Sequence, residues 1–159
     1  MADTLNTGLS AKQRADIAAT LNKVLADSYA LYLKTHGYHW NVRGPNFQSL
    51  HVLLEGQYQE EWAALDDIAE RIRALGELAP QGYGAFGNLS SIKDGNPENE
   101  WEAMLKELLA DNETVIRTLR EGFPTADEAG DEATADLLTQ RLQAHEKHAW
   151  MIRSTLGGK

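Results

Sequence analysis

Two histidines and two carboxylates in the first half of the chain, His39, His51, Asp66 and Glu70, are side chains of the types that bind metal ions. The chain has no cysteine, so thiolate ligands, thiol nucleophiles and disulfides are excluded, and oxygen and imidazole remain as ligands. Such ligands favour hard or borderline metal ions. These four residues are therefore the candidate metal ligands of this sequence.

The spacing of these residues is too wide for one chain to bind one ion with all of them. At about 100° and about 1.5 Å per residue, His51, Asp66 and Glu70 share one helix face, but His51 and Asp66 stand about 22 Å apart along the axis. Glu55 lies on the same face. If two copies of the helix pack antiparallel about a twofold axis, His51 of one copy meets Asp66 and Glu70 of the other, at two equivalent sites. His39 can fold back through the glycine-proline turn to supply a second imidazole.

The first two helices that carry these residues are predicted from apolar side chains at helical spacing. A capping box at Ser10 and Gln13 begins the first helix, which runs to about Trp40. Asn46 can cap the second helix, which continues until Gly76. The two helices together span the whole candidate site.

Two further helices follow in the second half of the chain. Pro97 suits the first position of the third helix, which Gly122 and Pro124 are expected to end or kink. The fourth helix is expected to begin near Asp131 and to end before Gly157. The pattern is almost wholly helical.

The long segment between the second and third helices decides the type of bundle. Residues 80–97 are rich in glycine and predict a crossover, in which Leu89–Lys93 is expected to form a short helical turn. Four long helices with one long crossover fit an all-α, ferritin-like four-helix bundle. We expect the bundle to span residues 10–156, with short tails at 1–9 and 157–159.

The remaining histidines have no carboxylate at a matching spacing. Di-iron bundles use Glu-x-x-His pairs that project into the core, and none of the five histidines has a glutamate three residues before it. The standard site inside one bundle is therefore not expected. We interpret His36, His145 and His148 as structural residues.

Composition and charge limit the classes of function. With 159 residues, 42% hydrophobic and a formal net charge of -9, the chain is expected to form one globular domain that attracts cations. The acidic balance argues against nucleic-acid binding by simple phosphate neutralisation. The sequence shows no signal peptide and no apolar run near the ~20 residues of a membrane span, so we expect a cytoplasmic protein without membrane contact.

Several stretches of the sequence resemble the Dps family, the mini-ferritins called DNA-binding proteins from starved cells. They are Lys34–Phe47, Leu50-His51, Leu65–Arg71, Thr134–Leu138, His145–Lys147 and Trp150-Met151. The resemblance covers nearly the whole chain beyond the N-terminal tail. It implies a hollow shell of twelve four-helix subunits, ferroxidase sites at dimer interfaces and a short helix in the crossover.

The resemblance also implies a role for each candidate ligand. His39 and His51 correspond to the two histidine ligands of one subunit, and Asp66 and Glu70 to the carboxylates of its neighbour. Glu55 falls where the family often has an acidic residue that can assist a second iron, so two ions are expected per inter-subunit site. Hard carboxylates with a few imidazoles stabilise ferric over ferrous iron, which favours oxidation at open coordination positions.

The expected reaction is oxidation of Fe(II), with hydrogen peroxide as the oxidant that the family prefers. The resemblance implies that paired oxidation releases no hydroxyl radical and that ferric mineral is stored inside the shell. Trp40 and Trp62 are candidate electron donors near the site, although an aromatic residue at helical spacing is more often part of a core. Zinc or manganese remains an alternative occupant, because ligand type and spacing do not fix the metal.

DNA binding is the alternative function, in the form of a nucleoid-associated, DNA-compacting protein with an incidental metal site. The first eleven residues contain no Lys or Arg, and the C-terminal tail offers only Arg153 and Lys159. We therefore expect weak or absent DNA binding at physiological salt. The acidic cluster at residues 127–136 is most simply a solvated helix start, although by the resemblance Asp131 or Asp136 can line pores that draw in Fe(II).

Overall fold

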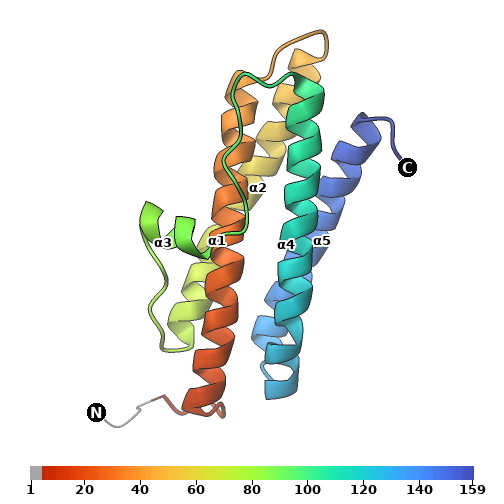
Figure 1. Ribbon diagram of the computed structural model, residues 1–159. Helices are drawn as coiled ribbons and strands as arrows, with labels where there is room; N and C mark the ends of the chain where they lie inside the picture. Colours follow the sequence, from red (N-terminus) through yellow and green to blue (C-terminus); the bar gives the residue numbers. More distant parts are fainter. Residues whose placement is uncertain (1–4) are drawn as a thin grey trace.

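The computed structural model describes residues 5–159, which form helices and connecting segments without a β-strand. Residues 1–4 of the expected N-terminal tail lie outside this range. Figure 1 shows four long helices side by side and one short helix in the crossover, so the prediction of an all-α four-helix bundle is confirmed. The helices are α1 (Ala11–Asn41), α2 (Phe47–Ala74), α3 (Tyr83–Leu89), α4 (Trp101–Ala129) and α5 (Glu132–Thr155).

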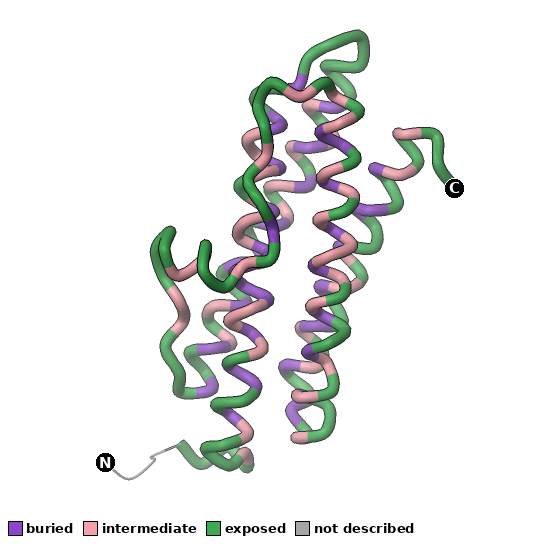
Figure 2. Tube along the Cα trace, viewed as in Figure 1, coloured by how far each residue is buried: buried purple, intermediate pink, exposed green. Residues whose placement is uncertain are grey.

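The bundle consists of two helical hairpins that share one core. α1 packs along α2, α4 packs along α5, and α1 joins the hairpins through its contact with α4, whereas α2 and α5 pack only sparsely. Ile17, Leu54, Leu108 and Ile152, one from each long helix, are completely buried, and buried positions line the inner faces of the helices in Figure 2. Burial of each such side chain stabilises the fold by about 1.5–3 kcal/mol.

Most of the predicted helix ends are correct. Ser10 accepts a hydrogen bond from the Gln13 amide while the Gln13 side chain accepts one from the Ser10 amide, which is the expected capping box. Asn46 is the N-cap of α2, but its side chain makes no capping hydrogen bond. Asp131 caps α5 as expected, and Gly130 ends α4 in the left-handed conformation at φ 72°.

The predicted start of the third long helix is wrong, and the helix does not end at Gly122 or Pro124. α4 begins at Trp101 rather than at Pro97, and it continues through Pro124 to Ala129. Pro124 is exposed, so the carbonyl group that loses its helical partner can bind water. Ala126, one turn from the helix end, is buried, and its packing holds the last turns on the bundle.

The short helix of the crossover also differs from the prediction, because it covers Tyr83–Leu89 instead of Leu89–Lys93. The later segment is held extended by a buried carboxylate. Asp27 of α1 accepts hydrogen bonds from the Ser91 amide at 2.6 Å and from the Thr118 hydroxyl at 2.8 Å. These contacts fix the crossover against α1 and α4. None of the helices among residues 5–159 is long and apolar enough to span a membrane.

Candidate metal centre

His39 and His51 meet where the first helical hairpin turns. His39 lies in the last turn of α1 and His51 in the second turn of α2, so the short connection brings them together. Their rings stack with centroids 3.7 Å apart and planes inclined by 20°. The expected approach of His39 to His51 is therefore present in the structure.

A reciprocal pair of hydrogen bonds fixes how these two rings present their nitrogens. His39 Nδ1 donates to the His51 carbonyl and His51 Nδ1 donates to the His39 carbonyl, both at 2.8 Å. A backbone carbonyl only accepts, so the proton of each neutral ring is on Nδ1, and Nε2 keeps its lone pair. Such an arrangement orients histidine ligands in metal sites. Each ring is therefore in the tautomer that can bind a metal ion through Nε2.

The predicted carboxylates lie on the same helix but not beside these histidines in one chain. Asp66 and Glu70 are exposed, and Glu55 is half-buried with a hydrogen bond from Gln59 at 3.4 Å. No grouping of three or more metal-ligating side chains among residues 5–159 includes His39 or His51. Within one subunit, the structure brings together two of the predicted ligands, His39 and His51.

The two helices of the first hairpin, which carry the predicted ligands, also expose large apolar side chains. Trp40 is 67% exposed, Val52 60% and Trp62 57%. The Trp62 ring also contacts Tyr32, with centroids 5.2 Å apart. Large apolar residues that are so exposed are typical of a surface that another protein covers.

His36, which we expected to be structural, is part of an aromatic cluster beside His39. Its ring stacks on Tyr58 at 3.8 Å, and its Nδ1 lies 3.1 Å from the Tyr32 hydroxyl. Burial, followed by the charge of His39, lowers the pKa of His36 below its usual value. The packing agrees with a structural role.

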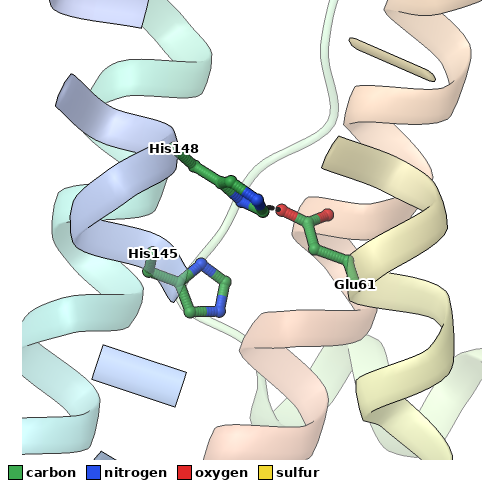
Figure 3. A group of neighbouring side chains, drawn as sticks. All are labelled: Glu61, His145 and His148. Carbon is green, nitrogen blue, oxygen red and sulfur yellow. Dashed lines mark ion pairs between the residues drawn. The ribbon is translucent and has the colours of Figure 1, made fainter. Parts of the chain in front are cut away.

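The structure brings together a second group that the sequence reasoning did not predict. Glu61 of α2 and His145 and His148 of α5 converge in the bundle interior, with one ligand atom from each within 4.8 Å of the others. All three are buried, and Figure 3 shows His148 directed at Glu61, with its Nδ1 at 3.5 Å from Glu61 Oε1. We name these residues the α2/α5 triad.

Charge and hydrogen bonding around the α2/α5 triad are incompletely satisfied. Burial raises the pKa of the Glu61 carboxyl, against the opposing effect of His148, and neither Glu61 oxygen has a hydrogen-bond partner. Burial, followed by the charge of Arg141, holds the pKa of His145 well below its usual value, so this ring is neutral at pH 7. Buried polar atoms without partners are rare in folded proteins and need an explanation.

A search along the sequence could not find this group, because its carboxylate and its imidazoles come from different helices. His145 and His148 are three residues apart and therefore share a face of α5, but no acidic residue stands at a ligand spacing from them on that helix. The one feature of the sequence that could have indicated this group is Glu61, an acidic residue within the apolar stripe of α2, between Leu54 and Ile68.

Asp131, one of the two candidate pore residues, makes its contacts within the subunit. Its carboxylate accepts two hydrogen bonds from Arg71 Nη2, at 2.7 and 2.9 Å, and caps α5 by accepting from the Thr134 amide at 3.1 Å. Burial raises the pKa of Asp131, but the bonds from Thr134 and Arg71 outweigh that effect and hold the pKa below its usual value. Asp136 is exposed.

A comparison of the sequence with protein families agrees with the four-helix fold. The profile of the ferritin-like domain matches residues 18–158, which is most of the chain. The protein is therefore a ferritin-like four-helix bundle.

Comparison with individual proteins shows which family of ferritin-like proteins the chain resembles. The chain is 36% identical to DNA protection during starvation protein 2 of Bacillus anthracis over 140 residues, which cover 88% of this chain and 96% of the relative. It is 40% identical, over 98% of its length and 88% of the relative's, to a low temperature-induced protein of Nostoc sp.. It superposes on the Dps protein of Vibrio cholerae O1, described as a ferritin-like diiron-carboxylate protein, with a TM-score of 0.92 at 29% identity, covering 98% and 99% of the two chains. The chain belongs to the Dps family.

Proposed function

We propose that the protein is a mini-ferritin ferroxidase, which oxidises Fe(II) at sites shared between two subunits and stores the ferric product in a hollow shell of twelve copies. The observation that carries this proposal is the pair His39 and His51, whose rings stack and whose reciprocal hydrogen bonds leave the Nε2 lone pair of each ring for a metal ion. Two imidazoles need carboxylate partners to bind iron tightly and to favour its ferric state.

The carboxylates come from a second copy in this proposal. Asp66 and Glu70 are exposed on α2, the helix that also carries His51, and about 22 Å separates His51 from Asp66 along the axis. Antiparallel packing of two α2 helices about a twofold axis brings each histidine pair to the carboxylates of the other copy. The exposed Trp62 and Val52 provide apolar surface for that interface.

The chemistry follows from two Fe(II) ions that are held at one site. Each ion loses one electron, and one hydrogen peroxide molecule takes up both electrons and two protons to give two water molecules, so no hydroxyl radical is released. His39, His51, Asp66 and Glu70 bind the first ion. Glu55, which is half-buried on the same face of α2, assists the second. Hydrogen peroxide is the preferred oxidant in this proposal, and the protein acts in the cytoplasm.

DNA protection, which the name of the Bacillus anthracis relative describes, would then result from the removal of Fe(II) and peroxide. Direct binding and compaction of DNA is the second candidate function, and the names of such relatives are what favours it. The formal net charge of -9 and the lack of Lys and Arg in the first eleven residues argue for weak binding.

The proposal is tested by loading the protein with Fe(II) under anaerobic conditions and following ferric absorbance after a pulse of peroxide. A double variant, His51→Ala with Asp66→Ala, should oxidise iron at least about tenfold more slowly than wild type, because each site loses a ligand from both subunits. Asp67→Ala, an exposed neighbour on the other side of α2, is the matched control and should behave as wild type. Equal rates in wild type and the double variant would refute the proposal.

A further inference from the structure

The α2/α5 triad lies inside one subunit, and the proposed ferroxidase reaction does not use it. Glu61 is 1% exposed, His145 0% and His148 7%, so the three side chains are removed from solvent. A carboxylate at such a position is costly unless it is protonated, hydrogen-bonded or bound to a cation. Both oxygens of Glu61 and Nδ1 of His148 lack a hydrogen-bond partner in the described structure.

We propose that Glu61, His145 and His148 bind one divalent transition-metal ion of the zinc class within each subunit. Two imidazoles and one carboxylate form a ligand set that zinc accepts, with one coordination position left for another donor. Ligand atoms in a tetrahedral zinc site stand about 3.3 Å apart. His148 Nδ1 and Glu61 Oε1 are already 3.5 Å apart, and a ligand atom of His145 lies within 4.8 Å of the other two residues, so His145 must move closer to complete the set.

The surroundings of His145 hold its ring as metal sites do. Its Nδ1 donates to Oδ1 of the buried Asn112 at 3.0 Å, and the amide of Asn112 is itself fixed by a bond to the Leu108 carbonyl at 2.8 Å. A histidine ligand typically donates its second ring nitrogen in this way, so Nε2 is the ligand atom. The Arg141 guanidinium lies 3.3 Å from that nitrogen, so it must move away for a metal ion to bind there. It can move toward Glu60, with which it already forms a bidentate ion pair.

A fourth ligand and an entry route are both available next to the triad. Gln57 precedes Glu61 by one turn of α2 on the same face, it is 3% exposed, and neither atom of its amide has a hydrogen-bond partner. A pocket of about 340 Å³ opens between α2 and α5, and its lining includes Glu60 and Arg141, which contact the triad. The bound ion would join two helices that otherwise pack sparsely.

The experiment counts metal ions in the assembled protein after the inter-subunit site has been disabled. The background is the double variant His39→Ala with His51→Ala, stripped of metal and titrated with ZnCl2 by calorimetry and elemental analysis. We expect one tightly bound Zn²⁺ per chain in this background. An added Glu61→Gln, which keeps the shape of the side chain but removes its charge, should abolish that binding. The control is His36→Gln, which replaces a histidine outside the triad and should leave zinc binding unchanged.

Two further measurements keep the proposal falsifiable if Glu61→Gln does not fold. Zinc at about one hundred times its dissociation constant should raise the thermal midpoint of the background protein by about 5–10 °C. Crystals soaked in ZnCl2 should show anomalous density between Glu61, His145 and His148. No tight ion in the background protein, an unchanged ion in Glu61→Gln, or density elsewhere with none at the triad would overturn the proposal.

Discussion

Replacement of Asp131 by alanine should destabilise the protein strongly, because this one carboxylate serves two structural purposes. It caps α5 through the Thr134 amide, and it accepts two hydrogen bonds from the Arg71 guanidinium on α2. Loss of an N-cap costs about 1 kcal/mol, and hydrogen bonds to a charged group contribute about 1.5–3 kcal/mol. The Arg71 side chain is 23% exposed, so its share belongs at the lower end of that range.

The free energy of unfolding should therefore fall by about 3 kcal/mol, which for a chain of this size lowers the thermal midpoint by about 6–12 °C. Circular dichroism at fixed protein concentration measures the midpoint. Asp131→Asn keeps an N-cap acceptor and should lose about half as much. Asp136→Ala, whose exposed carboxylate pairs with Gln140, is the control and should change the midpoint by less than about 2 °C.

The ion pair between Asp131 and Arg71 also predicts how the stability of the protein depends on pH. Because the folded pKa of Asp131 lies below its ordinary value of 3.8, its contribution is complete above that value and is lost as the pH falls toward the folded pKa. The difference in midpoint between wild type and Asp131→Ala should thus be largest near pH 7 and should shrink below about pH 4. A midpoint for Asp131→Ala within 1 °C of wild type at pH 7 would refute this reasoning.

Three further predictions concern Gly95 of the crossover, Tyr38 of α1, which contacts it, and DNA binding. Gly95→Ala should lower the thermal midpoint by several degrees, since a Cβ there would lie 2.4 Å from the Tyr38 hydroxyl, whereas Gly84→Ala, with no atom nearby, should not. Tyr38→Phe removes the hydrogen bond to Glu107 and the one accepted from the Asn96 amide, and it should cost about 1–2 kcal/mol in chemical denaturation. In gel-shift assays near physiological salt, plasmid DNA should migrate freely, and tight retention would contradict the expectation of weak binding.

The long helices could be predicted because their information is local. Ser10 and Gln13 begin α1 through contacts within one turn, and Asp131 begins α5 in the same way. The ends of α4 depend on tertiary packing, which allows that helix to continue past Pro124. The short helix of the crossover was predicted at the wrong residues for a similar reason. The conformation of the crossover depends on Asp27 of α1, which is distant from it in sequence.

The candidate metal residues likewise divide into those that local sequence could predict and those that depend on tertiary packing. The approach of His39 to His51 followed from one short turn, and the structure contains it. The meeting of Glu61 with His145 depends on how α2 and α5 are placed across the bundle, and no spacing along the chain records that. The stacking of His36 on Tyr58 likewise required the packing of two helices.

The central claim, that each ferroxidase site takes its ligands from two subunits, is tested most directly by mixing two inactive variants. One variant carries His39→Ala and His51→Ala, and the other carries Asp66→Ala and Glu70→Ala. Random co-assembly makes half of the dimers mixed, and one of the two sites in each mixed dimer has every ligand. Peroxide-driven Fe(II) oxidation should therefore return to about one quarter of the wild-type rate. A mixture that stays as inactive as its parents, or a single variant that is already active, would contradict the claim.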